Sequence, residues 1–164
     1  MSDLAVIEQD REQLNGLLFS LSDRTLLVPN TAVAELIGWQ PLTVPGTAAQ
    51  AANGLAGLIS WRGTEIPLVV LEVMDGGEEP EHGSSTRMAI MNSLGAMQGR
   101  GFYALLVQGI PRSVILDAYL QRDSAATLLP TEADAVHLDS RSVRIPDLEA
   151  IEENLFSILQ AQPL

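Results

Sequence analysis

The chain has 164 residues, enough for one domain or for two small lobes that share a core. Hydrophobic residues make up 46% of it and aromatic residues 4%, so its core must consist mainly of Leu, Ile, Val and Ala. The formal net charge of −12 argues against nucleic acid and anionic membrane surfaces as partners, because both attract clustered Lys and Arg.

The chain contains no cysteine, which excludes disulfide bonds, thiolate zinc sites and a cysteine nucleophile. Its first ten residues include acids and lack an apolar run of signal-peptide length. No stretch approaches the roughly 18 uncharged apolar residues of a membrane-spanning helix. We therefore expect a soluble cytoplasmic protein that does not insert directly into a membrane.

The first half of the chain alternates between apolar runs and turn residues. Residues 1–14 fit either a short helix or a frayed tail. Residues 17–29 predict a hairpin that turns at Ser22-Asp23-Arg24, and residues 32–39 predict a further strand that ends at Gly38. Residues 41–54 are rich in Pro, Gly and Ala and predict a long connection.

The apolar stretch at residues 55–74 predicts two strands, separated at Gly63-Thr64. It is followed by DGGEEPEHGSS, residues 75–85, which has glycines, acids and a proline without any periodicity. This composition is typical of a loop, and we expect the boundary between two halves of the protein there.

The second half again predicts short strands. Residues 86–94 and 102–116 are apolar and flank a Gly-rich turn, and we expect the longer run to be broken into short strands by its own turn residues. Residues 117–135 look mostly irregular. Residues 136–146 predict one or two more short strands.

The last element is a helix, expected at about residues 147–160. Acidic residues in its N-terminal half suit the helix dipole. Its apolar residues recur at helical spacing, and we expect this face to pack on the strands as core rather than to bind a partner. They are Leu148, Ile151, Leu155, Ile158 and Leu159. Many short strands with one terminal helix favour small β-barrels over alternating strands and helices.

The residues that carry chemistry in enzymes do not form a recognisable motif. His82 lies among the acids of the 75–85 loop, so a divalent-cation site is one hypothesis for that loop, although the spacing matches no ordered ligand motif. His137 and Asp139 share one face of a predicted strand, where we expect an exposed pair, and no serine lies in a nucleophile-elbow sequence. The Gly-Arg-Gly at residues 99–101 favours a hairpin turn over a phosphate loop. We expect no catalytic residue, no metal and no cofactor.

Arg62 and Gly63 interrupt an apolar stretch, and two interpretations are open. In the first they form a hairpin tip, in which Gly63 adopts positive φ and Arg62 points into solvent. In the second Arg62 is an anchor on a partner surface, together with Trp61, since Arg and Trp are enriched at binding hot spots.

The stretches FSLSDRTLLVPNTAVAELI, TVPG and GLISWRGTEIPLVVLEV resemble the CheW-like family of chemotaxis coupling proteins. The most specific shared pattern is the block Gly-x-x-x-x-Arg-Gly-x-x-x-Pro, and the second half matches more loosely. The resemblance covers roughly residues 16–116. The matching residues are Phe19, Leu21, Val33, Glu35, Leu36, Pro45, Gly57, Arg62, Gly63, Ile66, Pro67 and Leu71.

The resemblance implies a mostly β fold of two five-stranded, SH3-like barrel lobes packed together. Applied to this chain, it suggests lobe one at about residues 16–74 and lobe two at about 86–146, with exchange of strands between the lobes left open. It implies a non-enzymatic adaptor that joins a histidine kinase's regulatory domain to the cytoplasmic tip of a chemoreceptor. Val33, Glu35, Gly57 and Arg62 match positions at or near the receptor groove, and Trp61 and Gly63 complete the predicted partner surface.

The chain departs from the family pattern at several positions. Ser60 stands where the family usually has Asn, Glu72 ends the segment that is usually Asp-Leu-Arg, and Gln108 replaces an Asp in the second half. These changes suggest a divergent adaptor, for instance one in a chemosensory system for type IV pilus (twitching) motility, recruited to receptor arrays at the membrane. A structural homo-oligomer that self-associates through exposed β edges is a further alternative, besides the ligand- or metal-binding barrel.

Overall fold

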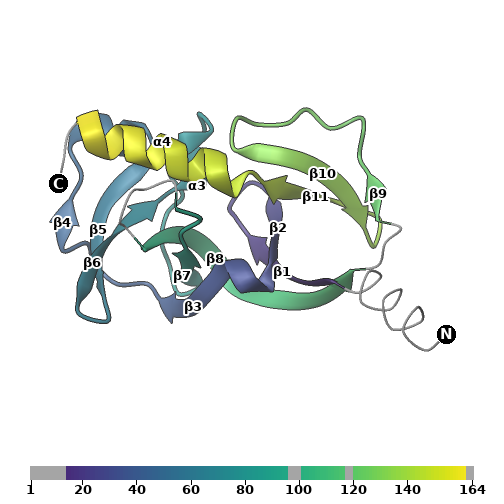
Figure 1. The fold of residues 1–164 in the computed structure, drawn as a ribbon, viewed down its shortest axis with the longest axis horizontal. Helices are drawn as coiled ribbons and strands as arrows, with labels where there is room; N and C mark the ends of the chain where they lie inside the picture. Colours follow the sequence, from purple (N-terminus) through teal and green to yellow (C-terminus); the bar gives the residue numbers. More distant parts are fainter. Residues whose placement is uncertain (1–13, 96–100, 117–119, 162–164) are drawn as a thin grey trace.

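A computed structural model describes residues 14–95, 101–116 and 120–161 of the chain. It is mostly β, with one long helix near the C-terminus. Figure 1 shows two groups of strands side by side, with β3 to β7 in one group, β1, β2 and β9 to β11 in the other, and β8 running through both. The expectation of a mostly β protein with a C-terminal helix is confirmed.

The N-terminal strands form the expected hairpin. β1 spans Leu14–Ser20 and β2 spans Thr25–Pro29, paired antiparallel from Gly16↔Pro29 to Ser20↔Thr25. A single 3-10 turn, η1, at Asn30–Ala32 leads into β3, at Val33–Gly38.

The middle of the first half forms the second expected hairpin. β5 (Leu55–Trp61) and β6 (Thr64–Val69) pair antiparallel through Trp61↔Thr64, as the break at Gly63-Thr64 predicted. A short helix, α3, follows at Leu71–Met74, which the apolar composition did not indicate.

The long connection predicted at residues 41–54 is wrong in part. It contains a two-residue strand, β4, at Val44–Pro45 and a helix, α2, at Ala48–Ala52. α2 begins with a capping box, in which the Thr47 hydroxyl accepts from the Gln50 backbone N–H and the Gln50 side chain accepts from the Thr47 N–H. This local pattern is the physical reason that an Ala-rich segment becomes helical here.

The apolar run at residues 102–116 is one strand and not several, contrary to the expectation. β7 (Thr86–Asn92) pairs with the first part of β8 (Phe102–Leu116), and β1 pairs with its second part. The change of partner coincides with a register shift near Gly109, whose φ is +68°. A bulge turns the strand without ending it, so turn-forming residues need not break a strand.

The last strands extend further than predicted. β9 has two residues, Gln121–Arg122, whereas β10 begins at Glu132 and runs to Leu138, inside the region expected to be irregular. β11 spans Arg141–Pro146, and α4 spans Leu148–Ala161, close to the expected helix.

The strands form a continuous hydrogen-bonded network in the order β4-β5-β6-β8-β1-β2-β11-β10-β9, with β7 pairing β8 and β3 pairing β7. β1 and β2, from the start of the chain, therefore lie next to β8 and β11, which come after the 75–85 loop. We call β3 to β7, with α2, α3 and the first part of β8, the first half. The second half comprises β1, β2, β9 to β11 and the rest of β8.

Each half encloses an apolar cluster of its own. The first half buries Ile59, Ile66, Leu68, Val70, Met88, Ile90, Ala104 and Leu106. The second half buries the smaller set Leu18, Leu27, Val136 and Val143. The alternation of β8 supplies Ala104 and Leu106 to the first of these clusters, while Tyr103, Leu105 and Val107 point the other way.

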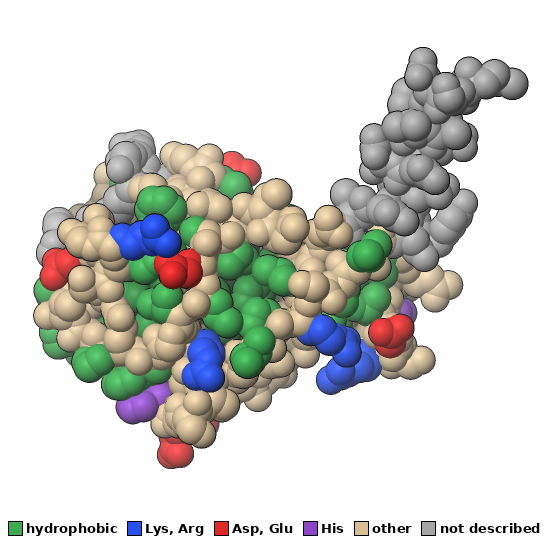
Figure 2. Space-filling view, turned by 90° about the horizontal axis from the view of Figure 1, so that it is seen from below, with side chains coloured by type: hydrophobic (Ala, Val, Ile, Leu, Met, Phe, Trp, Pro, Cys, Tyr) green, Lys and Arg blue, Asp and Glu red, His purple; other side chains and the backbone are tan. Residues whose placement is uncertain are grey.

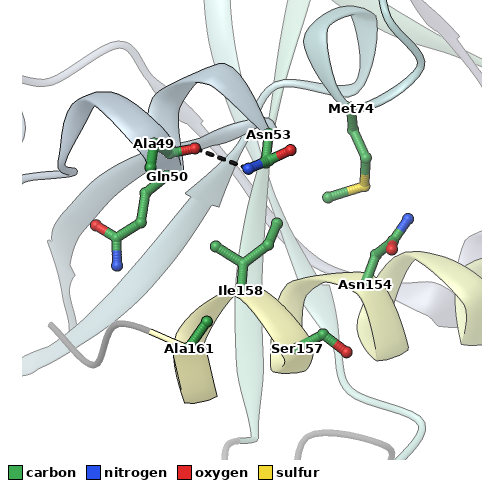
Figure 3. A pocket seen from close by; sticks show the side chains of 8 residues that line it. All are labelled: Ala49, Gln50, Asn53, Met74, Asn154, Ser157, Ile158 and Ala161. Atoms are coloured by element: carbon green, nitrogen blue, oxygen red, sulfur yellow. Dashed lines mark hydrogen bonds between the residues drawn. The ribbon is translucent and has the colours of Figure 1, made fainter.

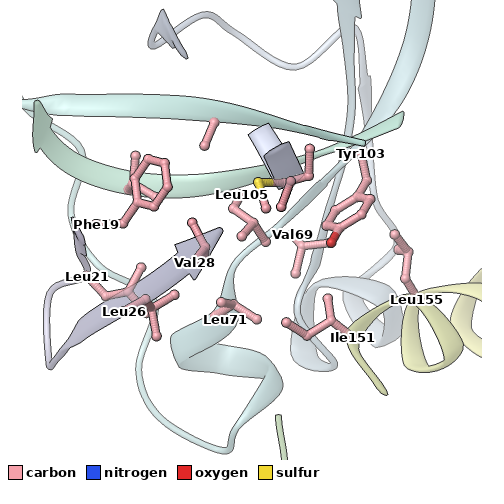
Figure 4. Close-up of a cluster of buried hydrophobic side chains, with 14 of the residues drawn as sticks. Phe19, Leu21, Leu26, Val28, Val69, Leu71, Tyr103, Leu105, Ile151 and Leu155 are labelled. Atoms are coloured by element: carbon pink, nitrogen blue, oxygen red, sulfur yellow. The ribbon is translucent and has the colours of Figure 1, made fainter. Parts of the chain in front are cut away.

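The largest cluster joins the two halves and α4. Figure 4 shows Phe19, Leu26 and Val28 from β1 and β2 facing Leu71 of α3 and Leu105 of β8, with Ile151 and Leu155 of α4 beside them. Ile151 and Leu155 are fully buried, which confirms the expectation that the apolar face of α4 is core. The Asp147 side chain accepts from the Ala150 N–H and caps α4.

Candidate functional site

Glu35, Trp61 and Arg62 form one small polar cluster at the edge of the first half. The indole N–H of Trp61 donates to Glu35 Oε2 at 2.7 Å, and Arg62 Nε lies 3.3 Å from the same oxygen. The Arg62 guanidinium lies over the Trp61 ring, 5.2 Å from its centroid. β3 supplies the acid and the β5–β6 hairpin supplies the other two, although 26 residues separate Glu35 from Trp61.

Arg62 and Gly63 are the two central residues of the β5–β6 turn. Their φ angles are +48° and +75°, the pattern of a type I′ turn, which fits the right-handed twist of paired strands. The hairpin tip expected from the sequence is therefore present, with Arg62 as well as Gly63 in the left-handed region. The Arg62 side chain is 71% exposed, so the tip leaves its guanidinium accessible while Glu35 and Trp61 orient it.

An aromatic contact and a hydrogen bond to the backbone hold the residues of this cluster in place. Trp61 packs against Phe102 with ring centroids 4.7 Å apart. The Gln40 side chain donates to the Ser60 carbonyl at 2.5 Å, which ties the segment after β3 to β5. Neither Phe102 nor Gln40 was predictable as part of this site, because no local motif in the sequence links them to the turn.

Glu35 is charged more readily than a free glutamate. The hydrogen bond from the Trp61 indole is the main reason that the pKa of Glu35 lies below its ordinary value of 4.5. Burial opposes this effect, and the hydrogen bond and positive charge of Arg62 add smaller lowering effects. At neutral pH the carboxylate therefore stays ionised and balances the Arg62 guanidinium.

Val33 lies near this cluster but faces the core. The register of β3 against β7 shifts between Val33 and Glu35, so two β3 positions oppose one residue of β7. Val33 and Leu36 consequently pack against the large cluster between the halves, and Leu17 of β1 also packs there. All three are partly buried apolar side chains.

Gly57 is not part of the polar cluster. It lies on β5, opposite Pro45 of β4, and a Cβ atom built on it would come 2.2 Å from the Val44 carbonyl oxygen. Any side chain here would push β4 away from β5. The described structure thus gives Gly57 a packing reason independent of a partner.

The acidic loop does not gather its carboxylates around His82. The imidazole of His82 stacks on Trp39 with ring centroids 4.2 Å apart. Asp75 is occupied by Arg24 and Thr131. Within the described residues no group of three or more His, Asp or Glu side chains could hold a metal ion. The loop hypothesis of a cation site therefore gains no support.

His137 has a different acidic neighbour from the one expected. Asp139 lies in the β10–β11 turn with φ of +49°, whereas His137 Nε2 is 3.5 Å from Asp123 Oδ1. The Ser142 hydroxyl donates to Asp123 at 2.7 Å, and this bond is the main reason that the pKa of Asp123 is lowered. The serine is thus bonded to an acid and not to the imidazole, an arrangement unlike a nucleophile with its base.

A cavity of about 330 Å³ lies between α2, the end of α3 and α4. Figure 3 shows Asn53 and Met74 on one side of it and Asn154, Ser157 and Ile158 of α4 on the other. Its lining carries no charged side chain, so it offers no acid or base for catalysis.

The underside of the molecule combines apolar and charged features. In Figure 2 hydrophobic side chains gather in the middle of this face, and separate arginine side chains lie to either side of them. Such a face has the composition of a partner surface, in which an apolar centre is surrounded by a few charges.

None of the helices in the described residues is long and apolar enough to cross a membrane.

The fold and the site together define a mostly β binding scaffold without an assembled catalytic group in the described residues. The model of the CheW-like domain family matches residues 15–155, so the chain belongs to that family. The family comprises non-enzymatic scaffolds of chemotaxis signal transduction, and this chain is such a CheW-like scaffold.

The fold is similar to a solved scaffold structure. The crystal structure of scaffolding protein TtCheW from Thermoanaerobacter tengcongensis superimposes with a TM-score of 0.67 at 19% sequence identity. The match covers 83% of this chain and 85% of that chain. No curated protein matches the sequence.

Proposed function

We propose that this protein is the adaptor that couples the cytoplasmic tip of a chemoreceptor to the regulatory domain of a histidine kinase, in the cytoplasm and next to receptor arrays. The observation that carries the proposal is the cluster of Glu35, Trp61 and Arg62, which presents an oriented and exposed guanidinium. The apolar centre of the underside, with positively charged side chains to either side of it, supports the proposal. A receptor tip is a helical hairpin, and an apolar groove with charges at its rim is a usual site for a helix.

We assign Val33, Glu35, Gly57, Trp61, Arg62 and Gly63 to the receptor surface in three roles. Arg62 contacts the partner directly, because it is the most exposed member with a free set of guanidinium donors facing solvent. Glu35 and Trp61 hold it in place, and Gly63 allows the turn. Val33 and Gly57 shape the strands beneath.

We further propose that each half is a five-stranded SH3-like barrel, counting its part of β8 as one strand and leaving out the two-residue strands β4 and β9. The separate apolar clusters of the two halves support this, because a closed sheet encloses side chains of its own. We propose that residues 75–85 form the boundary between the two lobes in the sequence, and that the lobes exchange strands across this boundary. β1 and β2 then join β8 and β11, and β7 joins β3.

The positions that depart from the family pattern support partners different from those of other members. We propose that the protein belongs to a system for pilus-based motility. Glu72 is buried and accepts from Ser22, and Gln108 lies 3.3 Å from the Thr86 hydroxyl, so these two positions serve the chain's own fold. A kinase that recognised charges at these positions in other members would not find them here. Deletion of the gene should reduce pilus-dependent spreading and spare swimming.

The first test compares Arg62→Ala with Arg122→Ala in a pull-down of tagged protein from its own cell lysate, with partners identified by mass spectrometry. Both arginines are exposed, at 71% and 74%, and each contacts one carboxylate through Nε, so they differ mainly in location. We expect wild type and Arg122→Ala to recover a methyl-accepting receptor or a histidine kinase and Arg62→Ala to lose it.

Equal recovery by both variants would reduce Arg62 to a hairpin tip. Recovery of neither partner by the wild type would contradict the adaptor function. Thermal unfolding of both variants should stay within about 1 kcal/mol of wild type, since exposed ion pairs contribute little.

A further inference from the structure

A buried polar network connects the two halves of the molecule at the side of α3. Asp75 ends α3, and its carboxylate receives the Arg24 guanidinium at 2.5 Å, the Thr131 N–H at 2.9 Å and the Thr131 hydroxyl at 2.6 Å. The Asp75 side chain is 1% exposed. Arg24 comes from the β1–β2 turn and Thr131 precedes β10, so a single carboxylate of the first half is bonded to two segments of the second.

The network extends on both sides of this contact. Arg24 Nε also lies 3.0 Å from Glu132 Oε2, an ion pair without hydrogen-bond geometry, and the other Glu132 oxygen accepts from Arg144 at 2.7 Å. The Glu132 side chain is fully buried. A second cross-connection comes from Glu72 of α3, which accepts from the Ser22 N–H and hydroxyl at 3.1 and 2.7 Å.

Such a network contributes little to stability, but it closely restricts the relative positions of the residues that it joins. Burying charges is unfavourable, and apolar side chains of similar volume often stabilise a protein as well or better. Hydrogen bonds to charged groups, however, depend on distance and direction, whereas apolar surfaces tolerate small displacements. The apolar cluster between the halves already holds them together, so the polar contacts add a constraint of a different kind.

We propose that Arg24, Asp75, Thr131 and Glu132, with Glu72 and Ser22, form a polar clamp that sets the orientation of the two halves. The clamp is a positioning device. It fixes how the strands of the first half stand relative to those of the second, and therefore the shape of any partner surface that draws on both.

The test measures distances between the halves by paired spin labels. The chain has no cysteine, so Ala51→Cys on α2 and Ser124→Cys on the second half give a single labelled pair across the clamp. Both positions are exposed. A pair within the first half, Ala51→Cys with Glu65→Cys, reports whether that half keeps its own structure.

In the otherwise unchanged chain we expect a narrow distribution of distances between the two labels of the pair across the clamp. Asp75→Asn, which retains the shape of the side chain and removes its charge, should broaden or shift that distribution and leave the pair within the first half unchanged. Arg122→Gln breaks an exposed ion pair with Asp134 on the second half and should change neither.

If Asp75→Asn does not fold, the paired replacement Arg24→Met with Asp75→Leu removes both charges and fills the space with apolar atoms. We expect this variant to fold and to show the broadened distribution. A folded variant of either kind that retains the distribution of the parent chain would overturn the proposal. No partner takes part in this experiment, so its outcome is independent of the adaptor proposal.

Discussion

At the scale of single residues, the turn at Arg62 combines two properties that the sequence offered as alternatives. Arg62 is the tip of a tight hairpin, and it is also held by Glu35 and Trp61 in an exposed position. A tip residue normally loses rotamer freedom when it binds a partner. Here the ion pair and the indole ring already restrict the guanidinium in the unbound protein, so less rotamer freedom is lost on binding.

Replacement of Glu35 should have an effect that depends on pH. The pKa of Glu35 is lower in the folded than in the unfolded protein, so its stabilising effect is present above the unfolded pKa and disappears as the pH falls through the folded pKa. Urea unfolding of wild type and Glu35→Gln should therefore differ most near pH 7 and converge below the ordinary pKa of 4.5. A difference that grows on acidification would contradict this.

Gly57 should not tolerate even the smallest side chain. A Cβ 2.2 Å from the Val44 carbonyl forces β4 and β5 apart. We expect Gly57→Ala to lower the free energy of unfolding by about 2 kcal/mol or more. Gly38→Ala is the control, since a Cβ there would meet no atom within 4 Å. Equal stability of the two variants would mean that β4 moves aside at little cost.

At the scale of elements, α4 contributes both apolar and polar contacts. Its buried Glu152 accepts from the Ser93 hydroxyl and from the Leu94 N–H at 2.9 Å, and so ties the helix to the end of β7. Nearby, burial and the charge of Glu152 raise the pKa of Tyr103, which remains neutral in the core. The helix therefore closes the large cluster from outside the sheet.

Truncation on the inner face of α4 should be costly. Leu155 is fully buried in the cluster that joins the halves. Leu155→Ala should lower the free energy of unfolding by about 2–5 kcal/mol, measured by urea titration, because it removes apolar contacts and leaves a cavity. Glu153→Ala, on the exposed side of the same helix, should change it by less than about 0.5 kcal/mol. Similar losses in both would show that α4 does not depend on this packing.

At the scale of the whole molecule, the two halves are connected by the apolar cluster, the polar clamp and a strand, β8, that serves both. Neither half can lose its structure without exposing apolar surface of the other. This arrangement favours a single cooperative transition in the chain as a whole.

Two probes can test this cooperativity. Both tryptophans, Trp39 and Trp61, lie in or beside the first half, so fluorescence follows that half, while far-UV circular dichroism follows strands throughout. We expect coincident urea transitions with one midpoint. An earlier dichroism change with unaltered fluorescence would mean that the second half unfolds alone.

The sequence by itself determined the elements whose causes are local. The hairpins of residues 17–29 and 55–69 follow from apolar runs around turn residues, and α4 follows from helical spacing with acids at its start. The Arg-Gly turn and the family pattern around it were equally visible. These features depend on neighbours in the chain, where propensity and periodicity act.

Only the tertiary structure decided what distant segments do to one another. β8 stays one strand because β7 and β1 share it, and β10 extends into a segment without local signal. Glu35 meets Trp61, and Asp75 meets Arg24 and Thr131, through contacts between residues 26 to 56 positions apart. Such contacts form because the chain closes on itself around shared apolar clusters, and local pattern carries no information on which segments will meet.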